Sequence, residues 1–279
     1  MSSLFPRVPV KVRSASGILF DDSVPMFCGG YYSGSKCDCF GYKQSEWVSY
    51  PAISPCRYYS ASAALTDQEN GKTRFVMSGG FNSSELSNVE AFDGEIWSSL
   101  PNLPSPVFGH CMVAINDTVL LSIGGYTNLG LTSKTYFFNS EMNEWSPGPE
   151  LNTPRYYFSC ATVNWKNPSD GQLEKVVVVA GGSNGQYMSS VELLYINNLS
   201  RGWQYGPQLP YSVANSVLVE YKDTVVLVGG GGTGVDGKHL YQLSSADGPW
   251  IEMEQILPIS KMDHIAFLIP DDLTDCQQA

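Results

Sequence analysis

The sequence is poor in charged residues, and in basic residues above all. Charged residues make up 15% of its 279 residues, with 16 Lys and Arg against 27 Asp and Glu and a formal net charge of −11. This shortage of positive charge argues against a nucleic-acid partner, which requires a basic face. The 3 histidines form no His-x-x-x-His pair and no closely spaced Cys/His quartet, so the sequence predicts neither a metal site nor a cofactor.

Long apolar runs and helical periodicity are also missing. The longest unbroken apolar runs, of which Val176 to Ala180 is one, are far shorter than the roughly 18 residues that cross a membrane, so we expect no membrane insertion. No stretch of a dozen residues has apolar spacing of 3.6, which predicts almost no helix. Hydrophobic residues at 43% nevertheless exclude a disordered chain. The first residues, Met1 to Arg7, lack the apolar stretch of a signal peptide, so the chain is either cytoplasmic or secreted with its leader removed.

A doubled glycine occurs at regular intervals, and a tryptophan follows each pair. The pairs begin at Gly29, Gly79, Gly124, Gly181 and Gly229, and the tryptophans are Trp47, Trp97, Trp145, Trp203 and Trp250. Both markers recur with a period of about 50 residues, which is the signature of a repeat architecture.

Each unit has the same internal order of short apolar runs and turns. In the third unit, Cys111 to Ile115 precedes a polar turn, a second run ends on the glycine pair, and Thr135 to Phe138 precedes the tryptophan segment. Four short strands joined by tight turns make one blade of a β-propeller. We therefore expect an all-β propeller with five complete four-stranded blades and a rudimentary sixth built from the two termini, with five-bladed closure as the alternative. The whole chain, 1–279, is then one domain with repeats at about 13–56, 57–106, 107–154, 155–211 and 212–260, and a closing strand and tail at 261–279.

The pattern resembles the kelch-repeat β-propellers. The resemblance rests on the doubled glycine, the tryptophan of the fourth strand, and the aromatic residue of the third strand, which is Tyr42, Phe92, Phe138, Tyr195 or Tyr241. In this family a basic residue often opens the next first strand, and Arg13, Arg57, Arg155 and Lys261 are assigned to that place, while Val107 and Ser212 depart from it. The resemblance implies the fold, whereas the function depends on the surface.

Kelch adaptors of ubiquitin ligases bind partners with the residues just after the glycine pair and at the opening of the first strand. The resemblance assigns these places to Tyr31, Tyr32, Phe81, Asn82, Tyr126, Thr127, Ser183, Asn184, Arg57, Arg155 and Lys261. The triplet Arg-Tyr-Tyr occurs at Arg57 and again at Arg155, which adds Tyr58 and Tyr156, and arginine with aromatics is typical of binding hot spots. We expect Arg57 and Arg155 to be exposed and to select a partner that carries a carboxylate.

These observations favour a non-catalytic module that binds a protein, a peptide or a glycan. Two alternatives stay open: a propeller enzyme, such as an oxidase or a sugar-modifying enzyme with an axial pocket, and an extracellular matrix component that associates with itself. An enzyme would need titratable residues that converge on the axis, and the sequence offers few of them.

Cysteines and sequons bear on the compartment. Adjacent antiparallel strands would bring Cys28 close to Cys39 or Cys37, so either pair could form a disulfide. Cys111 and Cys160 lie in first strands and are expected to be buried thiols. Asn82, Asn116 and Asn198 begin Asn-x-Ser/Thr sequons in expected loops, where they are candidate glycosylation sites. Together these features favour an extracellular protein, with the cytoplasm as the alternative.

Overall fold

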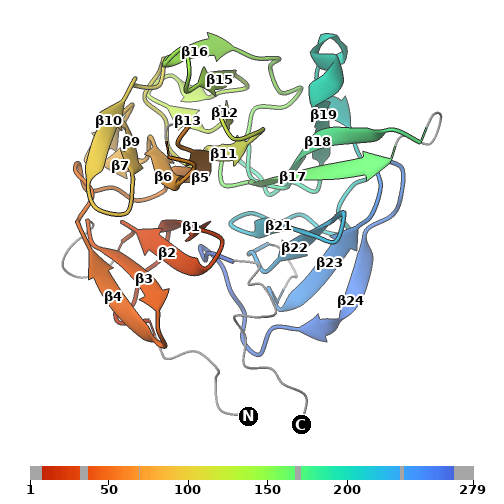
Figure 1. Ribbon diagram of the computed structural model, residues 1–279. Coiled ribbons are helices and arrows are strands. Elements are labelled where there is room, and N and C mark those ends of the chain that lie inside the picture. Colours follow the sequence, from red (N-terminus) through yellow and green to blue (C-terminus); the bar gives the residue numbers. More distant parts are fainter. Residues whose placement is uncertain (1–7, 32–36, 69, 167–170, 233–235, 267–279) are drawn as a thin grey trace.

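Five four-stranded antiparallel sheets surround a central axis in the computed structural model (Figure 1), which describes residues 8–31, 37–68, 70–166, 171–232 and 236–266. We number these sheets blades 1 to 5 in chain order. The strands are β1 (Ser16–Phe20), β2 (Val24–Cys28), β3 (Cys39–Lys43) and β4 (Glu46–Tyr50) in blade 1; β5 (Ala61–Thr66), β6 (Thr73–Ser78), β9 (Val89–Phe92) and β10 (Trp97–Leu100) in blade 2; β11 (Cys111–Ala114), β12 (Val119–Ile123), β15 (Thr135–Asn139) and β16 (Glu144–Pro147) in blade 3; β17 (Ser159–Lys166), β18 (Leu173–Ala180), β19 (Val191–Tyr195) and β20 (Gln204–Tyr205) in blade 4; and β21 (Val217–Tyr221), β22 (Thr224–Val228), β23 (His239–Leu243) and β24 (Ile251–Ile256) in blade 5.

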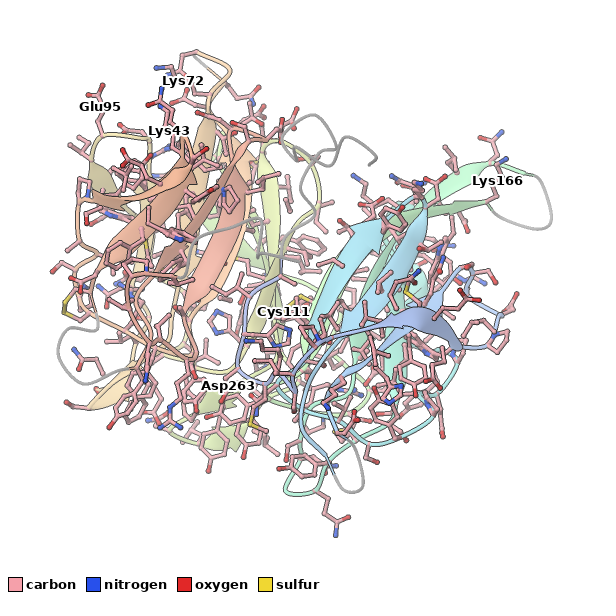
Figure 2. The ribbon with its side chains drawn as sticks, turned by 90° about the horizontal axis from the view of Figure 1, so that it is seen from below. Lys43, Lys72, Glu95, Cys111, Lys166 and Asp263 are labelled. Atoms are coloured by element: carbon pink, nitrogen blue, oxygen red, sulfur yellow. A yellow bond between two sulfur atoms is a disulfide. The ribbon has the colours of Figure 1, made fainter. Side chains whose placement is uncertain are left out.

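Little structure lies outside the blades. Two small hairpins, β7 (Phe81–Asn82) with β8 (Ser84–Glu85) and β13 (Tyr126–Thr127) with β14 (Gly130–Leu131), follow glycine pairs. In the described part of the chain, helix is confined to the 3₁₀ turn η1 (Ile196–Arg201). The β17–β18 hairpin is longer than its counterparts and projects from the ring, with Lys166 near its tip (Figure 2). The prediction of five complete blades and almost no helix is confirmed.

Apolar side chains join successive blades. One buried cluster lies between blades 1 and 2, one between blades 2 and 3, one between blades 3 and 4, and one between blades 4 and 5. The fourth-strand tryptophans add a bond across each of these interfaces. The Nε1–H groups of Trp97, Trp145, Trp203 and Trp250 donate to the carbonyl oxygens of Pro51, Pro101, Pro149 and Pro207, each in the preceding blade, at 2.8–2.9 Å.

A ring of backbone hydrogen bonds closes one end of the axis, and it has six members rather than five. Each member donates its N–H to the carbonyl of the member before it, at 2.8–3.2 Å. The members are Ser14, Tyr59, Gly109, Tyr157, Asn215 and Asp263, and all six have a positive φ between 51° and 61°. Asp263 therefore occupies a sixth position between blades 5 and 1, although its neighbours 261–266 form no strand. The rest of the expected rudimentary blade, at 1–7 and 267–279, lies outside the described residues.

Glycine is required where the second strand ends, because the residues that open the first strand of the same blade pack against the second glycine of the pair. Gly125 has a φ of +104°, and a Cβ there would lie 2.5 Å from Val107 Cγ2 and 2.7 Å from His110 Cβ. Neither contact is compatible with a side chain, so the doubled glycine is a packing requirement of the ring.

Three disulfides cross-link the described residues. Cys28 pairs with Cys39, the first of the two partners considered above, and Cys37 pairs instead with Cys56. The expectation that Cys111 and Cys160 are thiols is wrong. These residues lie on the neighbouring inner strands β11 and β17, with Cα atoms 6.2 Å apart, and form a disulfide between blades 3 and 4. Disulfides are typical of oxidising compartments and suggest an extracellular location. Within the described residues, no helix has the length and apolar character to cross a membrane.

Candidate binding face and axial pocket

The two arginines expected at the surface are buried. The Arg57 side chain has no solvent exposure and forms an ion pair with Glu90 of the same blade. Its other donors reach the carbonyl oxygens of Pro55 at 3.1 Å, Gly79 at 3.2 Å and Asn88 at 3.0 Å. All of these partners belong to the chain itself, so Arg57 ties the crossover between blades to the end of the second strand.

Arg155 repeats this arrangement two blades later. Its side chain and that of Glu192 are both 0% exposed, and Nη2 lies 2.6 Å from Glu192 Oε1. It also donates to the carbonyl oxygens of Thr153, Gly181 and Ser190 at 2.9–3.3 Å. The prediction of exposed arginines that select a carboxylate is therefore wrong for both positions. The carboxylate that each arginine selects is internal, because a charge buried at the crossover requires a partner.

The hydrogen bonds also correct the register of the repeats. The second glycine of each pair donates its N–H to the residue that opens the next first strand, and these residues are Arg57, Val107, Arg155, Val213 and Lys261. The opening residue of the fifth unit is therefore Val213 rather than Ser212. Arg13 pairs with Tyr31 in the same way that Tyr58 pairs with Phe81, so it lies one place after the opening position.

Aromatic side chains from several blades converge at the face where the first strands begin. We define the aromatic face as the eight residues Tyr31, Tyr58, Tyr59, Phe81, Phe108, Tyr126, Tyr156 and Tyr157, whose rings form one continuous set of contacts at centroid distances of 4.3–6.5 Å. Tyr31 (44% exposed) and Tyr126 (37%) are open to solvent, and the others are half-buried. The Arg13 guanidinium lies over the Tyr31 ring, 5.0 Å from its centroid.

The structure thus brings five of the expected binding residues into one surface: Tyr31, Tyr58, Phe81, Tyr126 and Tyr156. Asn82 is half-buried in β7 and Asn184 is exposed in the loop after the fourth glycine pair. Neither asparagine belongs to the aromatic face. Tyr32 lies outside the described residues. The expectations missed Tyr59, Phe108 and Tyr157, although their places, one and two residues after the opening residue, could have been found by aligning the units at that residue.

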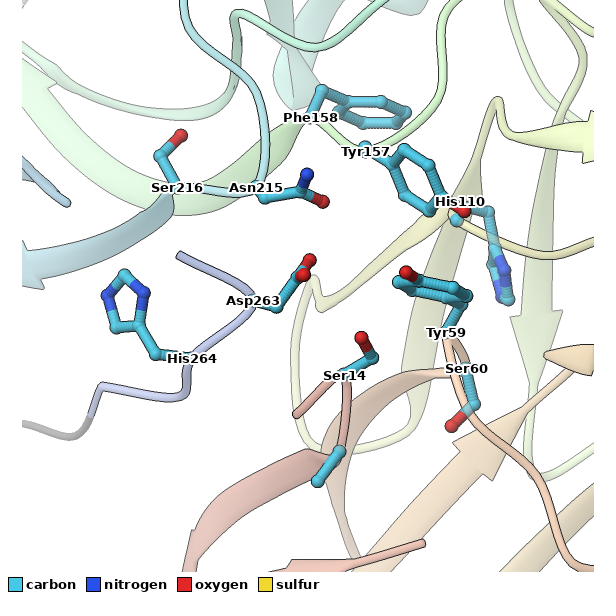
Figure 3. Close-up of a pocket in the computed structure, with 12 residues that line it drawn as sticks. Ser14, Tyr59, Ser60, His110, Tyr157, Phe158, Asn215, Ser216, Asp263 and His264 are labelled. Carbon is cyan, nitrogen blue, oxygen red and sulfur yellow. The ribbon is translucent and has the colours of Figure 1, made fainter. Parts of the chain in front are cut away.

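A cavity of about 120 Å³ lies on the axis next to the aromatic face, and Tyr59 and Tyr157 belong to both (Figure 3). Its wall combines the hydrogen-bonded ring with the residues that follow each ring member. The lining residues are Ser14, Ala15, Tyr59, Ser60, Gly109, His110, Tyr157, Phe158, Asn215, Ser216, Asp263 and His264.

Burial determines the charge state of the axial histidines. It lowers the pKa of His110 to about 3, helped by the charge of Arg57, and lowers the pKa of His264 to about 4, helped by Lys261. Both rings are therefore neutral near pH 7. His110 contacts Ser78 Oγ at 2.9 Å through Nε2, whereas neither nitrogen of His264 has a hydrogen-bond partner within the described part of the chain. Burial also raises the pKa of Asp263, and the charge of Arg13 opposes that shift.

The other candidate positions are more scattered. His239 is exposed in blade 5, beside Glu252 and Asp236. Across the described ranges, no group of three His, Cys, Asp or Glu residues could hold a metal ion. The sequon residues Asn116 and Asn198 are exposed, whereas Asn82 is half-buried.

Comparison with known proteins agrees with the architecture. The solved structure of YjhT superposes with a TM-score of 0.72 at 15% identity, over 95% of this chain and 90% of that one, which shows a shared fold. Kelch-like protein 34 of Homo sapiens is 26% identical over 185 residues, and the F-box/kelch-repeat protein At1g67480 of Arabidopsis thaliana is 33% identical over 105. The chain is a kelch-repeat β-propeller.

This propeller is also 24% identical over 181 residues to spermatocyte protein spe-26 of Caenorhabditis elegans. The matches cover 60%, 58% and 36% of the propeller for spe-26, Kelch-like protein 34 and At1g67480 in turn. They span only 30%, 27% and 26% of those proteins' own lengths. No family model matches the propeller sequence.

Proposed function

We propose that the propeller is a non-catalytic module that binds a protein or peptide through the aromatic face. The observation that carries this proposal is the continuous set of ring contacts from Tyr31 in blade 1 to Tyr156 in blade 4. A cluster of aromatics spread over four blades can contact a partner much larger than a single substrate. The kelch-like and kelch-repeat names of two relatives support the same class of function.

The composition of the face suits recognition. Tyrosine presents a large apolar ring and a polar hydroxyl at low entropic cost, which is why it is enriched in binding surfaces. Aromatic rings stack on peptide groups and on sugars alike, so a glycan remains the alternative ligand. The axial cavity of about 120 Å³ is smaller than the roughly 300–1,000 Å³ typical of small-molecule sites, which favours surface binding over catalysis at the axis.

A selection experiment tests the proposal. A random-peptide phage library is selected on the purified propeller, and the enriched peptides are measured against a Tyr58→Ala/Tyr156→Ala double variant. Tyr205→Ala is the matched control, because Tyr205 is a 65% exposed tyrosine on the outer strand β20. We expect the double variant to bind at least about tenfold more weakly, since losing two hot-spot side chains costs roughly 2 kcal/mol or more. The control should bind as the wild type does.

Equal binding by the folded double variant and the wild type would refute the aromatic face as the site. A glycan array probed in parallel separates peptide from sugar recognition. Sedimentation velocity over a range of concentrations tests the third outcome, in which a second copy of the chain covers this face.

We also propose that the propeller works outside the cytosol. The three disulfides support this location, and Asn116 and Asn198 are exposed sequons that glycosylation enzymes could reach. Intact-mass measurement before and after treatment with an N-glycosidase, on protein purified from its natural source, tests both points. An unchanged mass with every cysteine open to alkylation would place the protein in a reducing compartment.

A further inference from the structure

From the geometry of the axial pocket we infer that Asp263, with Tyr59 and Tyr157, binds one cationic side chain, a lysine or an arginine, that the partner inserts at the axis. This inference rests on the proposed function, since it gives the chemistry of the partner residue that enters the axial pocket beside the aromatic face. It concerns a single residue of the partner, and the remaining contacts belong to the aromatic face.

The carboxylate of Asp263 is the first reason. It is half-buried, and Figure 3 shows it directed into the space between Ser14, Asn215 and the two tyrosines. Neither a hydrogen bond nor an ion pair from any described residue reaches this carboxylate. A carboxylate that leaves bulk water without a partner loses solvation free energy, so a cation that enters the pocket restores a favourable interaction.

A second and independent reason is the unpaired hydroxyl of Ser14. The residue is only 7% exposed, its Oγ has no hydrogen-bond partner among the described residues, and it lines the same pocket. Buried polar groups in folded proteins are almost always paired, so an oxygen without a protein partner at a pocket wall is available to a ligand that carries donors. Both Ser14 Oγ and the Asp263 carboxylate accept hydrogen bonds, and ammonium and guanidinium groups supply donors.

The ring positions of these residues favour a pre-formed site. Ser14, Tyr59, Tyr157 and Asp263 are held in left-handed backbone conformations by the ring of six hydrogen bonds. Strained non-glycine conformations are retained where the surrounding structure over-determines them, often at binding sites. The pocket walls therefore need little rearrangement when a ligand enters.

The aromatic walls and the charges around the pocket agree with a cation. The rings of Tyr59 and Tyr157 lie 4.6 Å apart, and ring faces attract cations. The neighbouring histidines His110 and His264 are neutral near pH 7 and do not repel one. Arg13, whose charge acts on Asp263, is exposed and stacked on Tyr31 rather than paired with the carboxylate.

The size of the pocket limits the ligand to the end of one side chain. An engineered cavity of about 150 Å³ holds one benzene molecule, so about 120 Å³ accommodates a guanidinium or an aminobutyl group. A nucleotide or a sugar chain is too large for this volume. Entry from the aromatic face would place the rest of the partner over the eight rings.

Titration with small probes tests the inference without any knowledge of the partner. The wild-type protein, with its tyrosine rings isotopically labelled, is titrated with n-butylammonium and with guanidinium, and the shifts of the Tyr59 and Tyr157 NMR signals are followed. Acetate and n-butanol serve as the anionic and neutral probes. We expect both cations to bind in the millimolar range and to shift both tyrosines, and we expect n-butanol to bind at least about tenfold more weakly than n-butylammonium.

The variant Asp263→Asn keeps the shape of the side chain and removes its charge, and asparagine tolerates the φ of +51° at this position. Asp223→Asn is the matched control, because Asp223 is exposed with a φ of +59° and lies in the turn after β21. We expect at least a tenfold loss of n-butylammonium affinity in Asp263→Asn, which corresponds to about 1.4 kcal/mol, and none in the control.

Three results would overturn the inference: equal affinity of wild type and Asp263→Asn for the cation, equal affinity of the wild type for n-butanol and n-butylammonium, or preference for acetate. The comparison of probes uses only the wild type and stands even where the variant does not fold. Peptides that bind the aromatic face but need no basic residue would refute the cation site and leave the proposed function intact. Cation binding without any peptide binding would refute the proposed function and leave the cation site intact.

Discussion

Replacing Arg57 by alanine should destabilise the propeller strongly, because the change breaks a buried ion pair. Glu90 is 5% exposed, and its side chain takes no hydrogen bond from the described residues other than the one from Arg57. Three carbonyl oxygens, those of Pro55, Gly79 and Asn88, lose their arginine donors as well. Removing one partner of a buried pair costs about 3–5 kcal/mol. For 279 residues that cost lowers the melting temperature by roughly 5–9 °C.

The loss of stability in Arg57→Ala should depend on pH in a defined direction. Burial raises the pKa of Glu90, and Arg57 opposes that shift. Without Arg57 the folded-state pKa rises further above the unfolded value of about 4.3, so the folded variant binds a proton that the unfolded chain releases. The deficit in the free energy of unfolding of Arg57→Ala, relative to wild type, is therefore fully present above the folded-state pKa of Glu90. It shrinks as the pH falls through that pKa toward about 4.3.

Urea unfolding at pH 8 and at pH 5, with wild type measured beside the variant, checks both the size and the sign. The double variant Arg57→Leu/Glu90→Leu serves as the comparison, because it removes both charges and should be more stable than Arg57→Ala alone. A loss below about 1 kcal/mol at pH 8 would refute the account of a buried pair. A deficit that grows on acidification would do so too.

Three further predictions follow from the packing. Trp97→Ala should cost about 3–5 kcal/mol in urea unfolding, because its indole packs on Phe92 and bonds to the preceding blade; a cost below about 1 kcal/mol would mean that it does not join the blades. Gly125→Ala should melt well below Gly130→Ala, since the two glycines have φ of +104° and +106° but only Gly125 has neighbours within 4 Å; equal melting would show that backbone strain alone matters. Non-reducing peptide maps should link Cys28 with Cys39, Cys37 with Cys56, and Cys111 with Cys160. Alkylation of any of these cysteines in unreduced protein would show that its disulfide does not form.

Much of the fold could be predicted from the sequence because a blade is a local unit. Its four strands follow one another along the chain and pair with their sequence neighbours, so the turns, the glycine pair and the tryptophan mark them directly. The period of these markers then predicts the number of complete blades. The same local logic found Tyr58 and Tyr156 through a repeated triplet.

What the sequence could not provide is the environment of a residue after the blades assemble. Arg57 and Arg155 look like surface residues in a list of loop positions, yet each meets a glutamate some 33–37 residues further along the chain and is buried. Cys111 and Cys160 lie 49 residues apart and meet only because their strands are neighbours around the axis. The ring position of Asp263 likewise depends on closure of the whole circle. Repeats therefore determined the blades, while the contacts between blades, which join distant segments, decided where the charges and the candidate site lie.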